Sequence, residues 1–67
     1  MKEIAPGVKL RNMDTKNIIH IIHVLENKGT QVIVYKYYAS GLRSWQYSAV
    51  DAKKLELLIQ KNLFTFV

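Results

Sequence analysis

The feature that most constrains the fold is a pair of runs rich in β-branched and aromatic residues. Residues 30–38 and 42–48 contain Val, Ile, Tyr and Trp, and a short connection through Ala39, Ser40 and Gly41 joins them. These residue types are enriched in strands, and a short connection that contains glycine is typical of a β-hairpin. The sequence therefore predicts a β-hairpin in this part of the chain.

Alternation along this hairpin predicts which side chains face the core. One side of the second run carries Arg43, Trp45, Tyr47 and Ala49, and the other side carries Ser44, Gln46 and Ser48. Because the second set is small and polar, we expect it to face water, with Trp45 and Tyr47 supplying the core. Tyr37 and Tyr38 are consecutive, so at least one of them lies outside.

Residues 14–28 have two interpretations. As a helix they gather their apolar side chains on one face, with Asp14 or Thr15 as the N-cap and Gly29 just after the C-terminus. As a strand they have the right β-branched composition, but both faces are apolar, as in a long bent strand that turns the corner of a barrel. The strand interpretation is favoured, and the helix stays open.

The two ends of the chain give clearer patterns. Residues 8–13 alternate as a short strand, with Val8 and Leu10 inward and Lys9 and Arg11 outward.

A helix follows residues 48–51, which either form a capping box or provide Asp51 as a direct cap. The helix extends to about residue 61, with a buried stripe of Leu55, Leu58 and Ile59 and a wet side of Lys53, Lys54, Glu56, Gln60 and Lys61. Residues 63–67 form a closing strand.

The favoured interpretation gives a mostly β protein with four strands, one helix and a last strand. This order, with patches such as Val-Ile-Val-Tyr-Lys-Tyr-Tyr at residues 32–38, resembles the small SH3-like barrels, including Tudor-like and KOW-like forms and many short phage proteins. The resemblance implies a fold only, because residues 14–17 lack the glycine of a KOW turn. The alternative is an α+β protein, an open sheet of order β-α-β-β-α.

Length and cysteine content limit the class of protein. A chain of 67 residues forms one domain, residues 1–67, whose small core is favourable to self-association. The absence of cysteine excludes a disulfide scaffold and favours the cytoplasm. The start, Met1-Lys-Glu-Ile, lacks the apolar run of a signal peptide, and two histidines interrupt the longest apolar stretch, residues 18–25. We therefore expect neither export nor membrane insertion.

Charge indicates the class of partner. Ten Lys and Arg against five Asp and Glu give a net charge of +5 and a pI of about 9.7. This balance favours phosphate backbones or acidic protein surfaces. The frequent Ile, Lys, Asn and Tyr are the bias of an AT-rich genome, such as that of many bacteriophages.

Metal-binding and catalytic patterns are weak. His20, His23 and Glu26 are regularly spaced, but on a strand the two histidines would face opposite ways, and no fourth ligand has an obvious position. We therefore predict no metal and no cofactor.

No constellation predicts an enzyme. No cysteine is present, and none of the serines lies in a nucleophile-elbow sequence. The carboxylates are Glu3, Asp14, Glu26, Asp51 and Glu56, and Asp14 and Asp51 are explained as helix caps. The protein is therefore expected to bind rather than to catalyse.

The candidate contact surface is basic and aromatic, and its centre is the hairpin. Its residues are Lys9, Arg11, Lys16, Tyr35, Lys36, Tyr37, Tyr38, Arg43 and Trp45. Interleaved rings and cations stack bases and hold phosphates, which favours nucleic acid or its machinery as the partner. The alternatives are a modulator of a host enzyme or defence system, and a homo-oligomer that pairs through residues 63–67.

Overall fold

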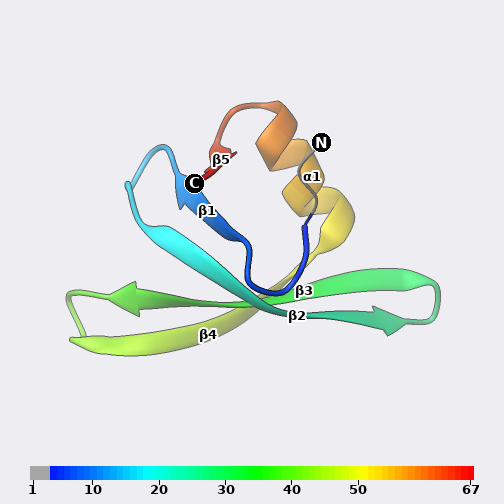
Figure 1. The fold of residues 1–67 in the computed structure, drawn as a ribbon, viewed down its shortest axis with the longest axis horizontal. Coiled ribbons are helices and arrows are strands. Elements are labelled where there is room, and N and C mark those ends of the chain that lie inside the picture. Colours follow the sequence, from blue (N-terminus) through cyan, green and yellow to red (C-terminus); the bar gives the residue numbers. More distant parts are fainter. Residues whose placement is uncertain (1–3) are drawn as a thin grey trace.

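The computed structural model describes residues 4–67. Five strands and one helix follow along the chain (Figure 1): β1 (Lys9–Asn12), β2 (Ile18–Asn27), β3 (Thr30–Ala39), β4 (Ser44–Asp51), α1 (Ala52–Gln60) and β5 (Phe64–Phe66). The protein is mostly β with one short helix in this range. Met1–Glu3, on which the signal-peptide expectation and one of the carboxylates rest, lie outside the described residues.

The strands form one antiparallel sheet in the order β4-β3-β2-β1-β5. The sheet is not closed, because β4 and β5 are its two edges and do not pair with each other. Figure 1 shows the β2–β3 and β3–β4 hairpins extending in opposite directions, with β1, β5 and α1 on one side of them. The helix contacts β3, β4 and β5. One face of the central strands is therefore covered, and the other is open.

Residues 18–27 are strand β2, so the helix alternative and its β-α-β-β-α order are wrong. The β-branched residues of β2 pair with β1 on one side and with β3 on the other. A bulge shifts the register between Ile21 and His23, which explains why the alternation of this segment is broken. Gly29 caps no helix: Lys28 and Gly29, with φ of 52° and 79°, form the two-residue turn to β3.

The connection from β1 to β2 is organised by Asn12 and not by Asp14. The side-chain oxygen of Asn12 accepts hydrogen bonds from the backbone N–H groups of Asp14 at 2.9 Å and Thr15 at 3.1 Å. The prediction that Asp14 or Thr15 caps a helix is wrong, because an Asx turn occupies this position. The strand before the loop is confirmed, with Leu10 buried and Lys9 and Arg11 exposed.

The hairpin between β3 and β4 is confirmed, with a longer connection than expected. Ala39 pairs with Ser44, so residues 40–43 form the turn. The N–H groups of Leu42 and Arg43 donate to the carbonyls of Ala39 and Ser40 at 3.1 and 3.2 Å. Arg43 adopts a φ of 52° in this turn and does not belong to the strand as predicted.

Helix α1 follows the predicted pattern, and the closing strand covers only residues 64–66 of the predicted 63–67. Asp51 is the N-cap, and its carboxylate accepts a hydrogen bond from the N–H of Lys53 at 2.8 Å. Leu55 is buried, and Ile59 packs against the core. The five residues predicted for the wet side are exposed. After the helix, Asn62 takes a φ of 62° and the chain enters β5, which pairs with β1.

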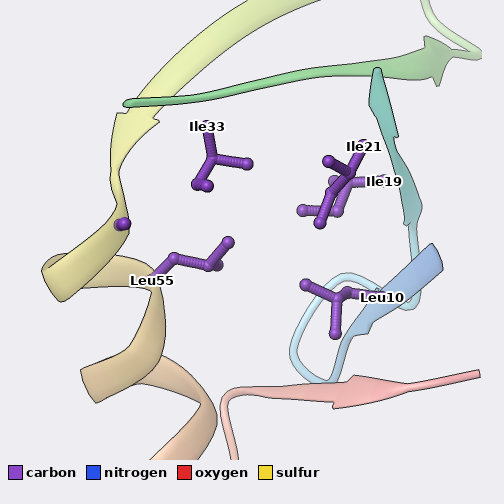
Figure 2. Packing of buried hydrophobic residues seen from close by; sticks show 6 residues of the cluster. Leu10, Ile19, Ile21, Ile33 and Leu55 are labelled. Carbon is purple, nitrogen blue, oxygen red and sulfur yellow. The ribbon is translucent and has the colours of Figure 1, made fainter. Parts of the chain in front are cut away.

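The core is small and comes from three strands and the helix. Its buried residues are Leu10, Ile19, Ile21, Ile33, Ala52 and Leu55. Figure 2 shows the side chains of Leu10, Ile19, Ile21, Ile33 and Leu55 pointing toward one another between the sheet and α1. Because these residues occupy the inward positions of β1, β2 and β3, the alternate residues of the same strands point away from the core.

Within residues 4–67, α1 is the one helix, and its nine residues are too few to span a bilayer.

Replacing Ile33 by Val tests the position of the core. Ile33 is 1% exposed, so loss of one methylene should lower the free energy of unfolding by about 0.5–1.5 kcal/mol. Leu42→Ala is the control, because Leu42 is 69% exposed in a turn and should change this value by less than about 0.5 kcal/mol. Urea unfolding followed by circular dichroism measures both. Equal losses would contradict this core.

Candidate functional site

A row of polar side chains crosses four strands on the side of the sheet away from the core, which we call the outer face. Lys9 of β1 pairs with His20 of β2, His20 pairs with Lys36 of β3, and Lys36 pairs with Tyr47 of β4. Directly paired residues of neighbouring strands project to the same side. These four residues, the outer row, therefore lie next to one another in one line across the sheet.

Trp45 lies beside this row and contacts two of its members. Its ring is 5.3 Å from the His20 ring and 5.6 Å from the Tyr38 ring, centroid to centroid, and both contacts are edge-to-face. The Lys36 Nζ lies 5.0 Å from the centroid of the Trp45 ring, within the range of a cation–π contact. Trp45 is still 45% exposed. The indole is thus held by three neighbours and remains accessible.

The outer face has a cationic character near Trp45. Lys9, Arg11 and Lys36 project from β1 and β3, and the ladder pairs the outer row with no acidic residue. The described carboxylates lie elsewhere, at Asp14 in a loop, Glu26 near the end of β2, Asp51 at the helix cap and Glu56 on α1. An anion that reaches this face therefore meets cations without a competing carboxylate from the row.

His20 is kept neutral by this setting. Desolvation, followed by the nearby ammonium groups of Lys9 and Lys36, lowers the pKa of His20 from its ordinary value of 6.5. At pH 7 the imidazole is therefore neutral and carries one N–H donor and one acceptor nitrogen.

The core determines which residues reach the outer face. Ile33 is buried, so Tyr35 and Tyr37, which follow at spacings of two, also face inward and pack against the core. The residues between them, Lys36 and Tyr38, must then face outward. In β2 the same rule places Ile19 and Ile21 inside and His20 outside.

Five of the nine predicted contact residues share the outer face: Lys9, Arg11, Lys36, Tyr38 and Trp45. Tyr35 and Tyr37 do not, and their rings lie together on the core side at 6.2 Å. Lys16 and Arg43 are exposed in the β1–β2 and β3–β4 connections. The expectation that one of Tyr37 and Tyr38 lies outside is confirmed, and Tyr38 is that residue, at 46% exposure.

The predicted facing of β4 is wrong. Trp45 and Tyr47 are exposed, Tyr47 to 67%, whereas Ser44 and Gln46 are half-buried and the Gln46 Nε2 donates to the Ser44 Oγ at 2.8 Å. The reason is the register with β3, because Trp45 pairs with the outward Tyr38 and Gln46 pairs with the inward Tyr37. The large rings of Tyr35 and Tyr37 already pack against the core on this face. The neighbouring inward positions of β4 are therefore filled by the polar Ser44 and Gln46.

Two members of the site were missing from the predicted set, His20 and Tyr47. Both follow from the strand pairing, and Tyr47 has no local signal of its own in the sequence. Tyr47 was assigned to the core, and His20 belonged to a segment whose secondary structure was open. The alternation of Ile19, His20 and Ile21 is the one local pattern that marks His20 as outward on a strand.

The two histidines of β2 face the same side, and the prediction that they would face opposite ways is wrong. The bulge after Ile21 places His23 opposite Val34, which lies on the same face of β3 as Lys36. In residues 4–67 no group of three or more His, Cys, Asp or Glu side chains is arranged to hold a metal ion.

Comparison with protein-family models, with curated proteins and with solved structures finds no match for this chain.

The pKa of His20 tests the geometry of the outer row. An NMR titration of the His20 ring should give a midpoint below 6.5, and the double variant Lys9→Gln/Lys36→Gln should raise it, because two neighbouring charges are removed. Burial remains, so the midpoint stays below 6.5. The control Lys53→Gln/Lys54→Gln removes the same charge from α1. If both double variants move the midpoint equally, Lys9 and Lys36 are not the neighbours that this structure gives His20.

Acid should also weaken the fold through His20. The unfolded chain takes up the proton at a higher pH than the folded protein, so this contribution to stability is complete above the unfolded pKa and is lost as the pH falls through the folded pKa. His20→Gln should reduce the decline of urea midpoints below about pH 6.5. An identical decline in this variant would contradict the lowered pKa.

Proposed function

We propose that this protein is a non-enzymatic nucleic-acid-binding module that contacts its partner through the outer face. The observation that carries the proposal is the half-exposed Trp45, which lies among Lys36, His20 and Tyr38 on a face with further cations. Nucleic acid offers phosphates for the cations and base rings for the aromatic residues, which matches this combination.

The cations are spaced to follow a phosphate backbone. Lys9 and Lys36 flank His20 on either side, and Arg11 is two residues further along β1 on the same face. A chain of phosphates that crosses the sheet near the outer row would therefore meet one cation on β1 and another on β3. Neutralising phosphates releases counterions, which makes the resulting affinity strongly salt-dependent.

The aromatic residues are already placed for contact with bases. Trp45 is fixed by edge-to-face contacts with His20 and Tyr38, so little side-chain entropy is lost when a base packs on it. Tyr47 adds a second exposed ring on the same strand. The neutral His20 supplies a donor and an acceptor to a base edge beside Trp45.

The remaining two predicted contact residues border the same end of this face. The β1–β2 loop, with Lys16, begins just beyond the Arg11–Ile18 pair, and the β3–β4 turn, with Arg43, lies just beyond the Tyr38–Trp45 pair. In this proposal both cations add phosphate contacts at the end of the sheet nearest Trp45.

We further propose that the fold is a small SH3-like barrel. The strand order β4-β3-β2-β1-β5, the bulge in the long β2 and the helix between β4 and β5 support this assignment. In this proposal α1 fills the gap between the two edge strands, because it contacts β3, β4 and β5.

Fluorescence of Trp45 is the direct test, since it is the one tryptophan of the chain. Adding an oligonucleotide at low salt should quench the fluorescence, and the fitted affinity should fall steeply as salt is added. In Lys9→Gln/Lys36→Gln the slope of log K against log salt should decrease by about 1.4, or about 0.7 for each lost phosphate contact with a single strand.

The matched control is again Lys53→Gln/Lys54→Gln, which has the same net charge but keeps the outer face intact. Its salt slope should stay closer to that of the wild type. If no oligonucleotide quenches Trp45 or is retained on a filter at low salt, nucleic-acid binding is refuted, and a protein partner becomes the explanation for the exposed rings.

A further inference from the structure

The outer face carries three exposed rings close together. Tyr38 and Trp45 are directly paired across β3 and β4, and Tyr47 follows Trp45 by two residues on the same side of β4. Their exposures lie between 45% and 67%. Trp45 and Tyr47 lie on the edge strand β4, and Tyr38 lies on the neighbouring β3 on the same face as Lys36, so a ligand that reaches Lys36 also meets these rings.

The spacing of these rings is unsuited to stacked bases. Residues separated by two along a strand are about 6.8 Å apart, roughly twice the rise of 3.4 Å per nucleotide in a duplex strand. Two neighbouring bases that pack on Trp45 and Tyr47 must therefore separate from each other. A single strand does so readily, whereas a duplex keeps the faces of its bases stacked and inaccessible.

The width of the face points the same way. The outer row spans four strands, or about 14 Å for three interstrand spacings of about 4.8 Å, whereas the major groove is about 12 Å wide and admits a helix or a two-stranded ribbon. The whole outer row therefore cannot enter the groove at once, and because the groove presents only base edges, Trp45 and Tyr47 cannot stack on the base faces of an intact duplex.

We infer that the outer face binds single-stranded nucleic acid in preference to duplex, with bases on Trp45 and Tyr47 and phosphates on Lys9 and Lys36. This inference rests on the proposed function and specifies its ligand. DNA and RNA strands share the required chemistry, base rings and phosphates, so both belong to the same ligand class.

The test compares three probes of one mixed sequence at the same salt concentration: a 15-nucleotide DNA strand, the corresponding RNA strand and the blunt DNA duplex. Trp45 fluorescence and filter retention give the affinities. At least one single strand should bind about tenfold or more tightly than the duplex, as expected when base stacking on a ring is gained.

Variants separate ring contacts from phosphate contacts. Tyr47→Ala should weaken single-strand binding about tenfold and change duplex binding less than about twofold, because only the single strand uses the ring. Lys9→Gln/Lys36→Gln should weaken both. Leu57→Ala removes an exposed apolar side chain from α1 and is the control for truncation, with no change expected for either probe.

The outcomes distinguish the two proposals. Duplex affinity equal to or above that of both single strands, or an equal loss for strand and duplex in Tyr47→Ala, overturns the inference and leaves nucleic-acid binding intact. Failure of all three probes to bind overturns the proposed function itself.

Discussion

Burial of Ile33 against Leu10 and Leu55 is the constraint on which the rest of the structure depends. Ile33 lies on β3, next to the central strand β2, and the three residues are at most 1% exposed. Because side chains of a strand alternate, a shift of one residue in β3 would exchange its two faces. Fixing Ile33 inward therefore fixes Tyr35 and Tyr37 inward and Lys36 and Tyr38 outward. The register with β4 then carries Trp45 and Tyr47 to the outer face.

The bulge in β2 completes this arrangement. Ile19 and Ile21 pack in the core before the bulge, and Val24 packs against it after the bulge. Without the extra residue, the inward positions of the second half of β2 would be out of step with Ile33. The bulge thus keeps core-facing side chains in both halves of this ten-residue strand. His20 lies before the bulge, between Lys9 and Lys36, and desolvation followed by these two charges lowers its pKa.

Local patterns in the sequence were sufficient for much of the fold. The alternation at Leu10, the cap at Asp51 and the apolar stripe through Leu55 each reflect interactions between residues close in the chain. The predicted facing of Trp45 is wrong because it depends on pairing with Tyr38 across a turn that is longer than the predicted connection. A preference for burying large rings favoured the opposite answer, and the nonlocal register decided it.

The candidate site was predicted in part for the same reason. Lys9 and Arg11 follow from simple alternation, but the row from Lys9 to Tyr47 depends on three strand registers at once. His20 joins this row through pairing alone. The predicted contact surface contains Tyr35 and Tyr37 because composition identifies the hairpin as aromatic but does not indicate on which face its rings lie. In the structure both pack against the core.

Binding centred on the outer face, and not on α1 or the β2–β3 turn, is the central claim. Chemical-shift mapping of ¹⁵N-labelled protein during titration with a single-stranded oligonucleotide tests it most directly. The largest shifts should fall on Lys9, His20, Lys36, Tyr38, Trp45 and Tyr47, with α1 unaffected. Shifts concentrated on α1, or on the turn at Lys28 and Gly29, would contradict it.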